Sequence, residues 1–368
     1  MNRIGMGEVS LSEAEIRAAH EVLSSGALRQ GPRCEAFERD FARRFGATHA
    51  VSNSSGTAAL HLVWMSILEP GDEVLVPAFT FIATASTVTV AGGRPVFCDV
   101  DPNTFLMDLE DAEKRITDRT RAICPVHLFG NTMAMEQVQE LARRHGLKIV
   151  WDAAQAHGAR YQGRELAGYG DFVCYSFYPS KNMFVGEGGM TCTEDAEAAQ
   201  LLRDLRSHGQ TGKYYFTSLG LNYRMTDVEA AIGCEQIKGF DEKLATRRRN
   251  ARILMEALEP IAGIRPQVTT EGAEHAWHQF CLVVDPDKLG CDRDTLMKRL
   301  DEQGIDTGIH YPKGLHQQPV FEEIYGKPES LPVTEWLCEH ILAVPVHHGL
   351  SEEEAHRVAR TIAEVAGS

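Results

Sequence analysis

The sequence has no Cys-X-X-Cys pair, and its nine cysteines stand singly along the chain. Zinc and iron–sulfur sites need clustered ligands, and disulfide frameworks are typical of small secreted domains. The scattered spacing excludes these classes and predicts no metal site. We expect reduced cysteines within the core, several of them in apolar strand-like runs. They are Cys34, Cys98, Cys124, Cys174, Cys192, Cys234, Cys281, Cys291 and Cys338.

Long apolar runs are also missing, because no stretch approaches the roughly 18 consecutive apolar residues of a membrane-spanning helix. The first residues, MNRIGMGEVS, lack the apolar segment of a secretory signal. From these absences we expect no membrane partner and a cytoplasmic location.

Positive charge is scarce, since 37 Lys and Arg residues face 52 Asp and Glu residues, for a formal net charge of -15. The only short basic run, Arg247–Arg249, is typical of a solvated helix face. A nucleic-acid interface needs clustered positive charge, so we expect no nucleic-acid partner. The composition is otherwise globular, with 43% hydrophobic and 24% charged residues.

The 368 residues are enough for about two domains. From about residue 35 to residue 195, helical periods alternate with short β-branched runs, which is typical of βαβ units and a mostly parallel α/β sheet covered by helices. Such sheets bind ligands beyond the carboxyl ends of their strands. We expect strands at 73–77, 94–100, 121–126 and 148–152, and helices at 56–66, 83–91 and 135–145.

The pattern changes in the last third of the chain. A long helical stretch at 226–258 is followed by a strand at 280–284, a helix at 293–303, a strand at 306–311 and a closing helix. Ser351 and Glu354 have the spacing of a capping box at the start of that last helix. We therefore predict a large domain over residues 1–249 and a smaller α+β domain over residues 250–368.

The first segment with chemical potential is Ser52–Leu60, in which small polar residues lead directly into a helix. Free N–H groups at a helix N-terminus favour an anion, and Gly56 would let that anion approach closely. A plain helix cap formed by Ser54 or Ser55 explains the same residues equally well.

Two further segments each end an apolar strand with an ionisable residue. Asp152 follows Ile149–Trp151, which places its carboxylate at the edge of the sheet, where it either holds a positive charge or caps a helix. Lys181 follows Phe172–Tyr178, where burial would lower the pKa of its amine and make it nucleophilic, unless it is an ordinary loop lysine. The glycines at 186–189 precede a strand, so they make a weak phosphate loop.

The fourth segment is Gly220–Asp227, before the long helix, where Thr226 or Asp227 could serve only as a cap. Together the four segments describe a pyridoxal phosphate pocket. That cofactor needs a lysine for a Schiff base, a carboxylate on its ring nitrogen and an anion cradle for its phosphate.

In these segments the sequence resembles the DegT/DnrJ/EryC1/StrS family of sugar aminotransferases, which have the three-layer fold of type I pyridoxal phosphate enzymes. The resemblance runs through nearly the whole chain and rests on seven segments in one order. They are Ser55–Leu62, Gly71–Pro77, Asp152–Ala159, Ser176–Lys181, Gly186–Met190, Asn222–Met225 and Ile309–Pro312.

The resemblance implies a role for each matching residue. Lys181 forms the Schiff base, Asp152 pairs with the pyridine nitrogen, and Gln155 lies near the phenolic oxygen of the cofactor. A related branch of sugar 3-dehydratases has histidine in place of the lysine, so Lys181 argues against that branch. The phosphate is held by Gly56, Thr57 and Ser176, Phe81 stacks on the ring, and Asn222 reaches the phosphate of the other subunit in a homodimer.

The function that the resemblance implies is transfer of an amino group from an amino acid, L-glutamate, to a nucleotide-linked keto sugar. Pyridoxamine phosphate is then the form that carries the amino group. The expected sugar is an NDP-4-keto-6-deoxyhexose or its 3-keto isomer, with Arg29, Gln30, His310 and Tyr311 as candidate sugar contacts. Open alternatives are a keto-cyclitol aminotransferase, an aromatic starter-unit synthase and a non-catalytic regulatory protein that retains the fold.

Overall fold

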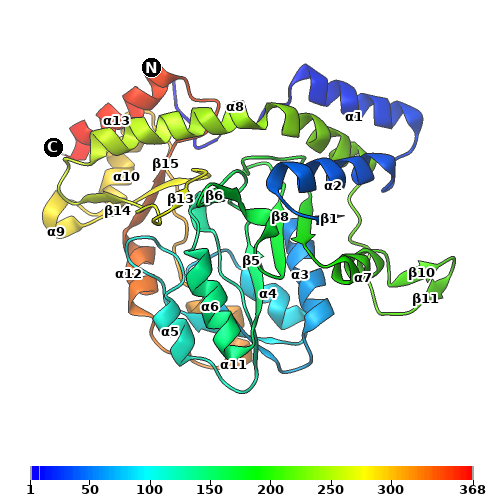
Figure 1. Ribbon diagram of the computed structural model, residues 1–368. Coiled ribbons are helices and arrows are strands. Elements are labelled where there is room, and N and C mark those ends of the chain that lie inside the picture. The colour runs from blue at the N-terminus through cyan, green and yellow to red at the C-terminus, as the bar shows by residue number, and fades with distance from the viewer. Residues whose placement is uncertain (1, 8, 367–368) are drawn as a thin grey trace.

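A seven-stranded sheet forms the centre of the computed structural model, which describes residues 2–7 and 9–366 (Figure 1). Strand β9 runs antiparallel to both of its neighbours, and the other four pairings are parallel. All strands other than β9 therefore end at the same edge of the sheet. In spatial order the strands are β1 (His49–Asn53), β9 (Gly189–Thr193), β8 (Phe172–Ser176), β5 (Lys148–Asp152), β4 (Thr120–Ile123), β2 (Glu73–Pro77) and β3 (Arg94–Cys98).

Helices cover both faces of this sheet because alternate strand residues point to opposite sides. Val150 packs in one apolar cluster with α3 (Gly56–Ile67), α4 (Ala83–Val90) and α7 (Ala196–Arg206). Trp151 packs in the other cluster, with the helices α2 (Pro32–Phe45), α5 (Leu109–Lys114) and α6 (Met135–His145). The predicted three-layer domain with a mostly parallel sheet is confirmed.

A smaller α+β unit lies beside the first, built on the antiparallel sheet β12-β14-β15 (Figure 1). Its core joins Ile4 to apolar residues between Ala251 and Ala366. The backbone of Ile4 is bonded to Gly304 and Asp306, so a segment from the start of the chain completes this unit. Its elements are β12 (Ile264–Pro266), α9 (Pro286–Leu289), β14 (Phe280–Val284), α10 (Arg293–Glu302), α12 (Pro332–His340), β15 (Ile341–Val344) and α13 (Glu352–Ala366).

The long helix α8 (Asp227–Leu258) spans both units, and its C-terminal part packs against α13. Thr226 and Glu229 form a capping box at its start, and Ser351 and Glu354 bond in the expected capping box before α13. The remaining elements are α1 (Glu13–Ser25), β6 (Arg160–Tyr161), β7 (Arg164–Glu165), β10 (Gln210–Gly212), β11 (Tyr215–Phe216), β13 (Ala273–Glu274), α11 (Pro319–Tyr325) and the 3-10 turns Leu128–Gly130, Leu166–Gly168 and Leu315–Gln317.

The predicted strand at 306–311 is wrong. Gly308 makes one isolated bridge to Ala343, through a reciprocal pair of hydrogen bonds of 3.0 and 2.8 Å. The N–H of Asp306 bonds instead to the carbonyl of Ile4, so this segment is divided between two partners. Beyond the bridge the chain leaves the sheet, which carries His310 and Tyr311 to a cavity of the large domain.

Seven of the nine cysteines are buried, as the sequence predicts, whereas Cys234 and Cys291 are partly exposed, and all nine are free thiols. None of the helices in residues 2–7 and 9–366 is long and apolar enough to cross a membrane. Within the same residues, no group of three or more His, Cys, Asp or Glu side chains is placed to hold a metal ion.

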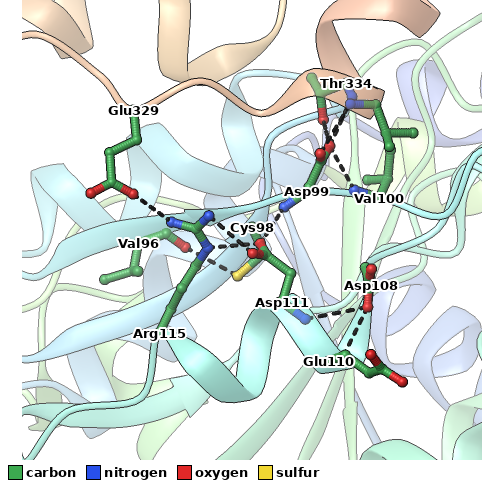
Figure 2. Close-up of polar contacts among 11 residues, drawn as sticks. Val96, Cys98, Asp99, Val100, Asp108, Glu110, Asp111, Arg115, Glu329 and Thr334 are labelled. Carbon is green, nitrogen blue, oxygen red and sulfur yellow. Dashed lines mark hydrogen bonds and ion pairs between the residues drawn. The ribbon is translucent and has the colours of Figure 1, made fainter.

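Asp99, just after β3, ties the sheet to α12 (Figure 2). Its carboxylate accepts hydrogen bonds from the N–H groups of Val333 and Thr334 at 3.0 and 2.8 Å, and from the Thr334 hydroxyl at 2.7 Å. The N–H of Asp99 donates to Asp111, which holds Arg115 through two further bonds. Asp99 is thus an N-terminal cap for α12 that is supplied by a different element.

We expect Asp99→Ala to lower the free energy of unfolding by about 3 kcal/mol, because several buried donors lose a charged acceptor at once. Urea unfolding followed by circular dichroism measures this change. The matched control is Asp108→Ala, which removes the local cap of α5 and should cost about 1 kcal/mol. Equal losses in the two variants would show that Asp99 acts only as an ordinary cap.

Candidate active site

A cavity of about 540 Å3 opens at the carboxyl edge of the central sheet. Its walls come from the segments that follow β1, β2, β5 and β8, which all end at this edge. Two segments of the last third of the chain, around His278 and His310, close its remaining side. The cavity therefore lies where a parallel sheet is expected to bind its ligand.

The N-terminus of α3 forms one end of the cavity. Ser55 caps the helix by accepting from the N–H of Ala58 at 3.0 Å. Gly56 and Thr57 occupy the first two helical positions, and within the described residues no acceptor is bonded to their N–H groups. The Ser55 cap is therefore present, and it leaves two N–H groups at the helix N-terminus for the predicted anion.

Gly56 is needed at this position for steric reasons. A Cβ atom there would lie 2.6 Å from the Cβ of Ser176, at the end of β8. Gly189 packs against the same turn, since its Cβ would lie 2.3 Å from the carbonyl oxygen of Ser55. Two backbone N–H groups and the Ser176 hydroxyl therefore line a tight pocket that suits a phosphate group.

Asp152 lies buried at the end of β5 and lines the cavity. Its Oδ1 accepts from the N–H of Ala154 at 3.1 Å, and its Oδ2 accepts from the hydroxyl of Thr84 at 2.8 Å. Burial raises the pKa of the Asp152 carboxyl, while these two hydrogen bonds and the charge of Lys181 oppose that rise. The carboxylate is thus placed to hold a positive charge inside the cavity.

Lys181 lies half-buried after β8 and also lines the cavity. Burial lowers the pKa of its amine to about 8, and the negative charge of Asp152 acts in the opposite direction. A neutral amine is therefore accessible near neutral pH, as a nucleophile or a proton acceptor requires. The next residue, Asn182, donates to the carbonyl of Ala276 at 2.9 Å, which fixes the turn that carries the lysine.

Gln155 and two aromatic residues form the wall above Asp152. The Gln155 side chain accepts from the N–H of Phe129 at 2.8 Å and donates to the hydroxyl of Tyr311 at 3.1 Å. The Phe81 ring is 55% exposed, lines the cavity and lies 6.5 Å from the Tyr311 ring. Phe81 is therefore free to cover a planar ligand.

The segment before β14 is locked to the turn after β4. The N–H of Ala276 bonds to the carbonyl of Gly130, and the N–H of His278 bonds to the carbonyl of Phe129, both at 2.9 Å. A Cβ on Gly130 would lie 2.9 Å from the nitrogen of Trp277. This contact sets His278 and Gln279 into the cavity wall.

Sequence reasoning missed several residues of the site. Thr80 lines the cavity and Thr84 supports Asp152, but both look like ordinary residues of a strand end and a helix. His278 and Gln279 are distant in the chain from every segment that drew attention. Glu187 also lines the cavity, although the sequence at 186–189 indicates only a weak phosphate loop made by its glycines.

Three predicted contacts do not line the cavity of this chain. Asn222 is exposed, and its backbone bridges to Ser207. Arg29 is also exposed, while Gln30 faces the buried guanidinium of Arg206. The other predicted residues, which are Gly56, Thr57, Phe81, Asp152, Gln155, Ser176, Lys181, His310 and Tyr311, all lie around it.

The residues present fit pyridoxal phosphate. Gly56 lets the N-terminus of α3 pack closely against Ser176, a buried carboxylate is available for the ring nitrogen, and the amine of Lys181 has a lowered pKa. These are the three groups that the cofactor requires.

Known proteins resemble the chain along nearly its whole length. Residues 9–363 match the model of the DegT/DnrJ/EryC1/StrS aminotransferase family. The structure of S. venezuelae DesV in complex with a ketimine intermediate has a TM-score of 0.91 at 37% identity, over 96% of this chain and 94% of DesV. The spore coat polysaccharide biosynthesis protein SpsC of Bacillus subtilis is 34% identical, over 96% of this chain and 95% of SpsC. A pleiotropic regulatory protein of Geobacillus stearothermophilus is 38% identical, over 95% of this chain and 93% of that protein.

We expect the amine of Lys181 in the cofactor-free protein to react with acetic anhydride along a pH curve centred near 8. Only the neutral amine reacts, so labelling should rise with pH through that value, as measured by mass spectrometry of the Lys181 peptide. Asp152→Asn should move the midpoint to lower pH, because the negative charge that raises the pKa of Lys181 is removed. A midpoint near the ordinary lysine value of about 10.4 would contradict the effect of burial.

Proposed function

The chain belongs to the DegT/DnrJ/EryC1/StrS aminotransferase family, and we propose that it transfers the amino group of L-glutamate to a nucleotide-linked keto sugar. Its reaction class is pyridoxal-phosphate-dependent transamination. The observation that carries the proposal is the meeting of Lys181, Asp152 and the Gly56 cradle in one cavity. The proposed acceptor is an NDP-4-keto-6-deoxyhexose or its 3-keto isomer, which places the enzyme in amino-sugar biosynthesis. The likeness to SpsC, named for polysaccharide biosynthesis, supports a sugar as the acceptor.

When bound, pyridoxal phosphate supplies an electron sink and carries the amino group between the two substrates. The N–H groups of Gly56 and Thr57 and the hydroxyl of Ser176 hold its phosphate. Asp152 holds the proton on its ring nitrogen, and Phe81 covers its ring face and keeps water out.

Lys181 is the residue that we propose to transfer protons between the substrates. Its Nζ would anchor the cofactor, and when this amine is free it would accept the proton from the α carbon of the donor. The pKa near 8 keeps part of the Nζ population neutral at physiological pH, which this step requires. The same amine returns a proton when the keto sugar accepts the amino group.

Gln155 and Tyr311 would contact the ring from another wall of the cavity. Their mutual hydrogen bond of 3.1 Å fixes the Gln155 amide in that wall, where it would hold the phenolic oxygen of the cofactor. His310 and Tyr311 line the cavity from a different part of the chain than the Gly56 cradle, and they are the contacts that we propose for the sugar.

A regulatory role is the second candidate, because one relative at 38% identity is named a pleiotropic regulatory protein. The cavity of this chain retains the lysine, the carboxylate and the glycine cradle that catalysis needs. A binding protein would not require an amine of lowered pKa beside a buried carboxylate.

We expect L-glutamate alone to release about one equivalent of 2-oxoglutarate per subunit from the cofactor-loaded enzyme, as a ping-pong reaction requires. A coupled assay for 2-oxoglutarate measures the product, and Lys181→Ala should give none. A screen of nucleotide-linked keto sugars with mass spectrometry of the products then identifies the acceptor. If glutamate, glutamine, aspartate and alanine all fail, the regulatory role is favoured.

The active unit that we propose is a homodimer with shared sites. Asn222 lies outside the cavity of its own chain, although the adjacent Tyr223 carbonyl accepts from Ser54, next to the cradle, at 2.8 Å. The β10–β11 hairpin nearby projects from the body of the molecule (Figure 1) and exposes 81% of Tyr214, while Leu219 is 92% exposed. An exposed apolar projection of this kind suits a second copy of the chain.

Mixing two inactive variants tests the shared site. Lys181→Ala lacks the anchoring amine, and Asn222→Asp places a negative charge where it should repel the phosphate of the partner. Verified mixed dimers should regain up to about half of the wild-type activity, because one of their two sites then contains neither defect. No recovery is expected if Asn222 serves its own chain, and that result would refute the shared site.

A further inference from the structure

Two threonines connect to Asp152 through hydrogen bonds, Thr80 in the segment between β2 and α4 and Thr84 in the first turn of α4. The hydroxyl of Thr84, which is fully buried, lies 2.8 Å from Oδ2 of Asp152. The hydroxyl of Thr80, four residues earlier, lies 3.2 Å from the hydroxyl of Thr84. The N–H of Thr84 bonds to the carbonyl of Phe81 in the turn that leads into α4, and this turn brings the two hydroxyls together.

The protons of this chain of hydrogen bonds have a defined direction when Asp152 is ionised. An ionised carboxylate only accepts, so the Thr84 hydroxyl must donate to it. Since that hydroxyl has one proton, its oxygen accepts from Thr80. The chain therefore runs from Thr80 through Thr84 to Asp152, and it favours the charged carboxylate over the neutral acid.

Few other groups are able to keep this carboxylate charged. Among the described residues, the titratable groups that interact with Asp152 are Lys181, Cys124, Cys174 and Tyr311. Burial raises the pKa of both thiols and of the phenol, so these three groups stay neutral near pH 7. The opposing influences on the pKa of Asp152 are then burial, which raises it, and Lys181, Thr84 and the N–H of Ala154, which lower it.

Lys181 cannot supply a constant charge, because its amine is neutral for part of the reaction. The pKa of this amine is already lowered by burial to about 8. At those stages the two hydrogen bonds to Asp152 are what the protein itself supplies to favour the ionised form, in addition to the charge of the ring nitrogen with which Asp152 pairs.

We propose that Thr84, supported by Thr80, is a positioning residue that keeps Asp152 ionised and fixes its carboxylate toward the ring nitrogen of the cofactor. The inference rests on the role proposed above for Asp152. It gives α4, which contributes no reacting group, the task of orienting the Asp152 carboxylate. Two oxygens held from two directions, by Thr84 and by Ala154, leave the carboxylate plane little freedom to rotate.

Thr84→Val removes the hydroxyl and keeps the shape of the side chain, whereas Thr84→Ser keeps the hydroxyl. In Thr84→Val the pKa of Asp152 should rise, so the ion pair with the ring nitrogen should be lost at higher pH than in the wild type. We expect the acid limb of the cofactor absorbance titration to move up by about one pH unit, with a cofactor Kd raised about tenfold. Thr84→Ser should stay within about twofold of the wild type, and Thr80→Val should show a smaller shift in the same direction.

The matched control is Thr87→Val, on the same helix. The hydroxyl of Thr87 bonds to Trp64 and to the carbonyl of Ala83 but does not contact Asp152. Thermal unfolding should show that both valine variants are folded, and the Thr87 variant should keep the wild-type absorbance titration. If the titration and the Kd of Thr84→Val equal those of the wild type, or if Thr87→Val shifts them equally, the inference is wrong.

Asp152→Asn separates this inference from the function that it rests on. A wild-type rate of the glutamate half-reaction in that variant would overturn the role of Asp152 itself, and the positioning role of Thr84 with it. A large loss in Asp152→Asn together with wild-type behaviour of Thr84→Val would overturn only the positioning role.

Discussion

The site depends on the backbone hydrogen bonds that join the turn after β4 to the segment before β14. Phe129 and Gly130 accept from His278 and Ala276, and Gly130 leaves no room for a side chain between the two backbones. The same turn donates to Gln155 through the N–H of Phe129. One contact between distant parts of the chain thus orders Gln155, the turn that carries Lys181 and the part of the cavity wall formed by His278.

Burial and the mutual attraction of their charges determine the protonation of Asp152 and Lys181 in the cavity. Removing Lys181 and Asp152 from water acts against the charge on both, and each charge partly offsets the effect of burial on the other. The Asp152 carboxylate also accepts two hydrogen bonds. Within the described residues, the amine of Lys181 makes none. The hydrogen bonds thus favour the charged form of Asp152, while the lowered pKa of Lys181 makes both protonation states of its amine accessible near neutral pH.

Local sequence patterns predicted the large domain well because a parallel sheet places strong, short-range demands on its residues. The strand at Lys148–Asp152 and the helix at Met135–His145 have the predicted bounds, since each has a clear apolar period and a clear stop. The strand expected at 121–126 ends at Ile123, because Pro125 has no N–H to continue the ladder. The roles of His278 and Thr84 in the site were not predicted. Their positions follow from packing between elements, and no motif in the neighbouring sequence indicates them. The prediction of a strand at 306–311 was wrong for the same reason, because Asp306 pairs with Ile4 whereas Gly308 pairs with Ala343.

The place of Ile4 in the smaller unit bears on how the chain folds during synthesis. Ile4 packs among apolar residues from Ala251 onward, and its N–H bonds to the carbonyl of Gly304. These partners leave the ribosome long after Ile4 does. The large domain can form its sheet while the Ile4 segment is still without its partner, so closing this contact is a late event of high sequence separation. A fusion attached close to Ile4 would therefore disturb the maturation of the opposite end of the chain, rather than the domain that follows it directly.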